Sequence, residues 1–149
     1  MSLAGWTPVL LMFVAGAFAA TQTPTNALLA TAVRSPVNAA LISFLVGSAV
    51  LLVAAGLFRV KPDGAAVRAL PWYAWLGGAY GAFFVVASAY SAPRIGVAAT
   101  VTLLIAGQVA AAALIDQTGA FGMLQRSLTP MRAVGLLLVV AGVVLVRRG

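Results

Sequence analysis

Long apolar segments separated by short polar connections run through the whole chain. The hydrocarbon core of a bilayer is about 30 Å thick, and about 20 helical residues are needed to cross it. Several segments reach or approach this length, and they run at about residues 8–33, 37–58, 71–92, 95–115 and 131–146. We therefore predict an all-α membrane protein with five transmembrane helices, which form one transmembrane domain over residues 1–149.

Prolines mark the starts of the predicted helices. Pro36, Pro71 and Pro130 lie at or just before a start, where a missing N–H costs little. Pro24 is different, because it lies inside the first apolar segment within the polar run 21–26. We expect it to bend the first helix or to loosen its hydrogen bonds.

Composition supports a membrane protein and narrows its chemistry. The chain is 63% hydrophobic and 7% charged, whereas soluble domains are about 45–50% apolar and about 25% charged. It contains no Cys, no His and only two acids, Asp63 and Asp116. Thiolate nucleophiles, imidazole catalysis and common zinc sites are therefore excluded. We predict that the protein is not an enzyme and holds no metal or cofactor.

The basic residues indicate membrane boundaries and not a nucleic-acid partner. Lys and Arg typically flank membrane spans, and their imbalance between the two sides sets orientation. Five spans place one set on the side of the N-terminus: Arg59, Lys61, Arg68, Arg126 and Arg132. The other side holds Arg34, Arg94, Arg147 and Arg148. Five against four predicts insertion in both orientations and an antiparallel homodimer, unless features outside the count select one orientation.

Polar side chains inside the predicted spans are the candidate substrate contacts. Gln22 and Asn26 are four residues apart and share a helix face beside Pro24. The alternative is that these amides only hold helices together. Gln108 lies at a depth that matches Gln22 of an antiparallel copy, although a helix–helix hydrogen bond explains it equally well. Tyr80 lies near mid-depth, where it either lines the pathway or packs.

The remaining notable residues lie at helix ends and on small-residue faces. Asp116 ends the fourth span, where the helix dipole disfavours an anion. We expect a basic partner from the same side, Arg126, Arg132 or Arg59, as either a gate or a structural ion pair. Asp63 belongs to a turn signature. Gly77 and Gly81 form a G-x-x-x-G pattern that is typical of close helix packing.

Taken together, these residues resemble one family. The matching stretches are Gln22…Asn26-Ala27-Leu28-Leu29-Ala30, Ser35-Pro36…Ile42-Ser43-Phe44-Leu45-Val46-Gly47, Pro71-Trp72…Leu76-Gly77-Gly78…Gly81-Ala82, Ala106-Gly107-Gln108…Ile115-Asp116…Gly119…Gly122 and Arg132…Gly135…Gly142-Val143…Leu145. They resemble the YdcZ-like family of five-helix proteins in the drug/metabolite transporter superfamily. The resemblance implies a multi-pass protein of the bacterial inner membrane. It also implies half of a ten-helix inverted-repeat transporter, completed by an oppositely oriented copy.

The expected function is therefore dual-topology transport of a small molecule by an antiparallel homodimer with a central cavity near the midplane. Because no acid lies deep in a predicted span, the substrate is expected to be a neutral or zwitterionic metabolite. A small multidrug exporter is one alternative, but those proteins resemble this chain only in size and topology and use a membrane Glu, which the chain lacks. A dual-topology ion channel and a non-transporting packing subunit are the others.

Overall fold

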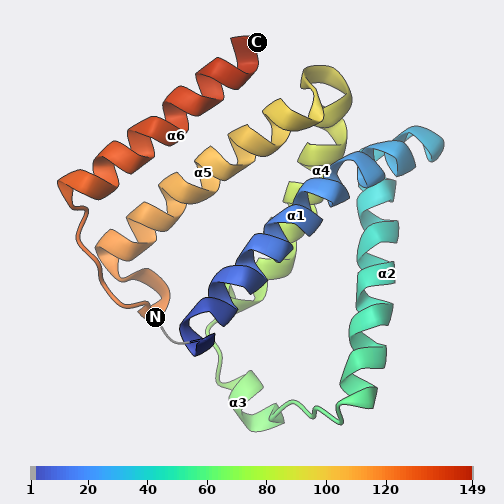
Figure 1. Ribbon diagram of the computed structural model, residues 1–149. Helices are drawn as coiled ribbons and strands as arrows, with labels where there is room; N and C mark the ends of the chain where they lie inside the picture. The colour runs from blue at the N-terminus through green and yellow to red at the C-terminus, as the bar shows by residue number, and fades with distance from the viewer. Residues whose placement is uncertain (1–2, 149) are drawn as a thin grey trace. The chain divides into compact units, whose positions relative to one another are not determined.

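The computed structural model describes residues 3–148, apart from the side chains of residues 3–5 and 147, and is helical without strands over that range. The predicted position of Arg147 at a membrane surface lies outside the described side chains. In chain order the elements are α1 (Leu3–Ala32), α2 (Pro36–Leu57), α3 (Gly64–Arg68), η1 (Trp72–Leu76), α4 (Gly77–Ile95), α5 (Val97–Thr118), η2 (Ala120–Gly122) and α6 (Pro130–Arg148) (Figure 1). The predicted all-α class is confirmed.

The five predicted spans correspond to α1, α2, η1 with α4, α5 and α6. Within the described residues, three helical stretches are long and apolar enough to cross a membrane: Trp6–Ala32, Pro36–Leu57 and Val97–Thr118. The apolar part of α6, Pro130–Val146, is shorter. Membrane insertion is therefore supported by three helices, and the count of five spans stays a prediction.

The polar run in α1 does not interrupt the helix. α1 continues through Pro24, so this proline does not end the helix, and the bend or loosening expected there stays a prediction. Thr23 donates its hydroxyl to the Ala19 carbonyl at 3.4 Å, and Thr25 donates to the Gln22 carbonyl at 2.9 Å. Such bonds to the preceding turn satisfy hydroxyl groups within their own helix. Both threonine hydroxyl groups are therefore satisfied within α1 itself.

Short polar caps begin the next two helices. Ser35 caps α2 by accepting a hydrogen bond from the Asn38 amide at 3.2 Å, and Pro36 is the first helical residue, as predicted. Asp63 accepts from the amides of Ala65 and Ala66 at 2.9 and 3.3 Å. It therefore nucleates the short helix α3, and the expectation of a turn alone was too limited.

Two helices end on an arginine in the left-handed region. Arg34 after α1 has φ 54°, and Arg59 after α2 has φ 52°. In each case the next amide bonds back to a carbonyl five residues earlier, Ser35 to Ala30 and Val60 to Ala55, both at 3.0 Å. This is the Schellman motif, whose left-handed position is usually glycine. Glycine does take that conformation at the end of α5, where Gly119 has φ 65°.

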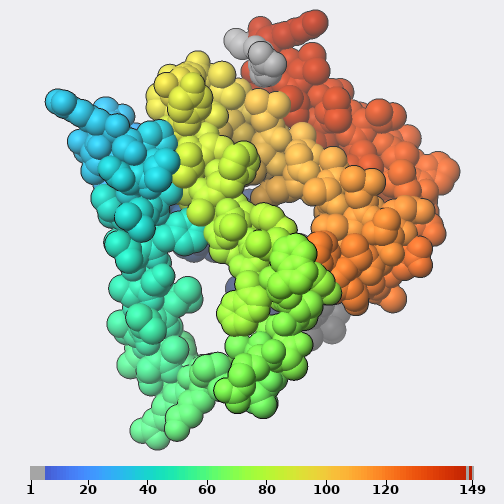
Figure 2. All heavy atoms as spheres, turned by 180° about the vertical axis from the view of Figure 1, so that it is seen from behind, coloured from blue at the N-terminus to red at the C-terminus, as the bar shows by residue number. Residues whose placement is uncertain are grey.

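The chain divides into two compact units, one reaching Arg94 and the other beginning at Ile95. Whether they form one transmembrane domain stays a prediction. In the first unit α1 packs against α2, and Ala30, Ala39 and Ala89 bring α1, α2 and α4 together. We call these three residues the alanine junction. Figure 2 shows an opening between α2 and the segment that holds α3, η1 and α4, so the helices of this unit diverge away from the junction.

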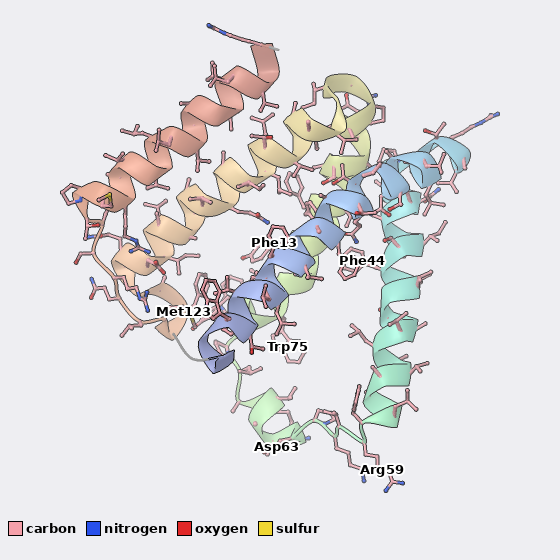
Figure 3. All side chains as sticks on the ribbon, in the orientation of Figure 1. Phe13, Phe44, Arg59, Asp63, Trp75 and Met123 are labelled. Carbon is pink, nitrogen blue, oxygen red and sulfur yellow. The ribbon has the colours of Figure 1, made fainter. Side chains whose placement is uncertain are left out.

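An aromatic side chain makes a second contact between α2 and α4. A β-carbon at Gly81 would lie 3.1 Å from Cζ of Phe44, whereas one at Gly77 would meet nothing within 4 Å. Phe44 lies on the inner side of α2 (Figure 3). Only the second glycine of the G-x-x-x-G pattern therefore provides a close approach within the described chain.

The second unit is a helical hairpin. α5 and α6 pack side by side, and η2 contacts α5 in the connection between them (Figure 1). Gly119 begins this connection with the left-handed conformation that suits glycine. Pro130 begins α6, as predicted.

Candidate functional site

The buried face of α1 carries half of its polar run. Thr23 is 1% exposed and Asn26 is 4% exposed, and Gln22 beside them is half-buried. Ala27 and Ala30 continue the same face and are also buried. Since α1 packs against α2, this face is a helix-packing surface as well as the predicted substrate surface. Both interpretations of Gln22 and Asn26 are therefore compatible with their position.

Asn26 is distinguished by an unsatisfied amide. Its side chain makes no hydrogen bond with any other residue between Leu3 and Arg148. Every fully enclosed side-chain nitrogen or oxygen in that range has a partner, so the Asn26 amide keeps a small opening to its surroundings. This opening leaves the Asn26 amide accessible to an additional hydrogen-bonding group.

Tyr80 and Gln108 do not complete a site in the described chain. Tyr80 is 61% exposed on α4. Gln108 is exposed on α5 and belongs to the second unit. The predicted match between Gln108 and Gln22 of an opposite copy stays a prediction, as does a pathway role for Tyr80.

Asp116 and Arg132 are brought together in the second unit. The Arg132 guanidinium donates to Oδ2 of Asp116 and, at 3.3 Å, to the Arg126 carbonyl. The Arg126 amide in turn donates to the Asp116 carbonyl at 2.7 Å. Of the three basic partners expected for Asp116, Arg132 is thus the one that forms the ion pair. The pair joins the end of α5 to the first turn of α6.

Gln117 is a structural residue that sequence reasoning missed. Its Oε1 accepts from the Leu128 amide at 2.6 Å, and its carbonyl accepts from Nε2 of Gln125 at 2.9 Å. These bonds hold residues 125–128 along the end of α5. In the sequence, Gln117 stands out only as an amide next to an acid at a helix end. Its hydrogen-bond partners lie eight and eleven residues away, so no local pattern indicates them.

Two grooves lie along the α5–α6 hairpin. The larger has a volume of about 480 Å³ and is lined by Ala106, Val109, Ala110, Ala113, Leu114, Gln117, Leu128, Leu136, Val139 and Val140. The smaller, about 320 Å³, contains the Asp116–Arg132 pair at its polar end. Gln108 lines neither groove. The ion pair is therefore the charged part of the lining of the smaller groove.

Arg94 is held at the end of α4 by an aromatic ring. Its guanidinium carbon lies 3.5 Å from the centroid of the Tyr90 ring, and it donates to the Tyr90 carbonyl one turn earlier. A cation over a ring face gains about 0.5–1 kcal/mol at an exposed site. This contact fixes one of the basic residues that were assigned to a membrane boundary.

Comparison with known protein families decides the relationship of this chain. The sequence model of a family described as "Putative inner membrane exporter, YdcZ" matches residues 7–145. The chain belongs to the YdcZ family. The match runs from α1 into α6 and confirms the resemblance drawn from individual motifs. Comparisons with curated proteins and with solved structures gave no match.

Membership in the YdcZ family fixes the general class of function. The family description is that of a membrane exporter, and apolar helices are present, so this YdcZ protein is a membrane protein of the transporter type and not one of an enzyme family. All six candidate residues, from Gln22 to Arg132, fall within the matched range. The description assigns no residue roles, so their roles are proposals.

Proposed function

We propose that this YdcZ protein is a dual-topology transporter of a small neutral or zwitterionic metabolite. Two copies with five spans each would pair in opposite orientations in the bacterial inner membrane. Together they would form a ten-helix carrier with a cavity near the midplane. Rocking of the two copies would expose that cavity to each side in turn.

The observation that carries the proposal is Asn26, a 4% exposed residue whose side-chain amide makes no hydrogen bond with any other described residue and keeps a small opening to its surroundings. In hydrocarbon such a group needs a partner from protein, water or solute. A substrate that bonds to Asn26 meets this need during part of the cycle. Gln22 lies one turn earlier on the same face and supplies a second amide. Gln108 and Tyr80 of either copy would lie near the same cavity.

A polar residue of the second unit supports a second copy. Gln108 is exposed on α5 and makes no hydrogen bond with any other described residue. A glutamine at this depth requires a polar partner. An antiparallel copy provides Gln22 at matching depth, and the near-even distribution of basic residues allows both orientations to insert.

The positions of the two acids favour a substrate without net charge. Asp63 is occupied as the cap of α3, and Asp116 is paired with Arg132. No acid in the described chain lies in the middle of a helix that could span the membrane. A cation would therefore lack a countercharge in the cavity. We assign the Asp116–Arg132 pair to a gate that holds the α5–α6 connection closed.

The proposal is tested by thiol accessibility, which is clean because the chain contains no cysteine. Asn26→Cys is expected to react with a membrane-impermeant thiol reagent in reconstituted vesicles, because an alternating cavity admits water. Leu28→Cys, on the opposite and 74% exposed side of α1, is the lipid-facing control and is expected to stay unreacted. If Asn26→Cys is as inert as Leu28→Cys, the cavity at this face does not exist.

A further inference from the structure

Neutral polar groups border the alanine junction of the first unit. Asn26 lies one turn before Ala30 on the same face of α1, and both are buried. Ser88 directly precedes Ala89 in α4 and is 5% exposed. Ala30 and Ala89 belong to one cluster, so the amide of α1 and the hydroxyl of α4 each belong to a residue near a junction alanine in its own helix.

The hydroxyl groups on these two faces have already used their donors. Ser88 donates to the Phe84 carbonyl at 2.7 Å, and Thr23 donates to the Ala19 carbonyl at 3.4 Å. A hydroxyl carries one donor and two acceptor lone pairs. Both side chains therefore present acceptors to any additional group.

A proline adds a backbone acceptor at the junction. Pro93 lies inside α4 and has no N–H, so the Ala89 carbonyl four residues earlier lacks its usual helical donor. Ala89 is 2% exposed and is one of the three junction residues. The neighbourhood of the junction consequently offers more acceptors than donors, apart from the unused amide of Asn26.

We propose that the junction binds a neutral carboxamide or urea group. This deepens the proposed function by naming a substrate class, and it rests on that function only for the claim that the bound solute is carried. The N–H and C=O of such a planar group match the acceptor and donor of the Asn26 amide in two hydrogen bonds. Its remaining N–H would meet the acceptors of Ser88 and the Ala89 carbonyl.

The same arrangement discriminates against related groups. A carboxylate offers only acceptors and a negative charge, and it would face the acceptor side of the junction unpaired. An N,N-dialkylated amide has no N–H to give. Within the described part of the first unit no charged side chain is buried, so an ionised group would find no countercharge. Recognition therefore depends on N–H donors in an uncharged group.

Binding is tested on the full-length protein in nanodiscs, without any transport. Three probes of similar shape are compared by saturation-transfer NMR: isobutyramide, isobutyrate and N,N-dimethylisobutyramide. We expect isobutyramide to bind at least tenfold more tightly than either of the others. Equal binding of the three, or preference for the acid, would overturn the inference.

Variants locate the binding. Asn26→Leu is expected to abolish isobutyramide binding, and the isosteric Asn26→Asp to weaken it at least fivefold while keeping the shape of the side chain. Ser88→Ala is expected to weaken it two- to tenfold, the size of about one neutral hydrogen bond. Thr25→Ala removes an exposed hydroxyl bonded within α1 and serves as the control with unchanged binding. If the folded Asn26→Asp and Ser88→Ala variants bind isobutyramide as tightly as the wild-type protein does, the junction is not the binding site.

The outcomes separate this inference from the proposed function. Solute flux by the wild-type protein without amide binding at the junction refutes the substrate class and leaves the carrier intact. Amide binding that depends on Asn26, in a protein that shows no solute flux, supports the binding assignment and refutes the carrier.

Discussion

Phe44 of α2 lies directly over Gly81 of α4, with its Cζ 3.1 Å from the place a β-carbon would take. That separation is shorter than ordinary van der Waals contact. Because glycine has no side chain, Gly81 leaves room for the Phe44 ring. The ring and Gly81 form a contact between α2 and α4 at a point away from the alanine junction.

Gly81→Ala is expected to stabilise the protein less than Gly77→Ala does, because its added carbon would lie 3.1 Å from Cζ of Phe44 and the crowding offsets the gain of about 1 kcal/mol that alanine brings to a helix. Thermal unfolding in detergent measures the effect. Gly77→Ala is the matched control, because nothing lies within 4 Å of its added carbon and alanine is the better helix former. If both variants unfold at the same temperature, the Phe44 contact does not constrain α4.

The ion pair between Asp116 and Arg132 predicts a charge-reversal experiment. Asp116→Asn or Arg132→Gln alone is expected to slow uptake in vesicles, because each frees the connection between α5 and α6. The exchanged pair, Asp116→Arg with Arg132→Asp, is expected to restore at least part of the uptake. The pair is partly exposed, so we expect a loss of no more than about 1 kcal/mol of stability from either single change. No rescue by the exchanged pair would argue against a gate.

α5 carries two glutamines, Gln117 and Gln108, for which we expect different roles. Gln117→Leu removes the acceptor of the Leu128 amide, and we expect faster hydrogen exchange at residues 125–128 with little change in dimer content. Gln108→Leu removes no hydrogen bond of the described chain, and we expect weaker dimerisation with unchanged exchange in the connection. Crosslinking and hydrogen-exchange measurements on both variants check the two outcomes. The reverse pattern would contradict the antiparallel pairing proposed for Gln108.

Orientation in the membrane is checked by labelling Gly149→Cys from outside intact cells. Dual topology predicts partial labelling, with about half of the protein accessible. Arg34→Gly removes one basic residue from one side and Arg59→Gly one from the other, and they are expected to shift the labelled fraction in opposite directions. Complete labelling of the unmodified background, or none, would show a single orientation.

Electrical recording separates a carrier from a channel. A carrier is expected to saturate with substrate and to pass no measurable single-channel current in a planar bilayer. Discrete ion currents from the purified protein would favour the dual-topology channel. Uptake that is unchanged in Asn26→Ala, together with altered assembly, would instead indicate that the amides serve only helix packing.

The helices could be predicted from the sequence because their signals are local. The lengths of the apolar segments and the prolines at positions 36 and 130 predicted most ends of the long helices to within a few residues. The partner of Asp116 could be narrowed only to three arginines, because the choice of Arg132 depends on how the connection folds. The interactions of Gln117 were not predictable, since they join residues across an irregular loop.

For the polar run of α1, the local sequence signal was misleading. Its residue types suggested a broken helix, yet Thr23 and Thr25 bond to their own backbone and the helix continues through Pro24. Which of its side chains are enclosed depends on the packing of α2. The burial of Asn26 therefore could not be predicted from spacing alone, although its shared face with Gln22 could.

The arginines that end α1 and α2 have a practical consequence for stabilising this protein. A left-handed residue other than glycine costs about 1–2 kcal/mol, so Arg34→Gly and Arg59→Gly are expected to raise the unfolding temperature. A screen that selects for heat resistance would then favour both substitutions. If these two charges help set orientation, such a screen would enrich proteins that survive heating but insert with the wrong ratio of inward to outward copies.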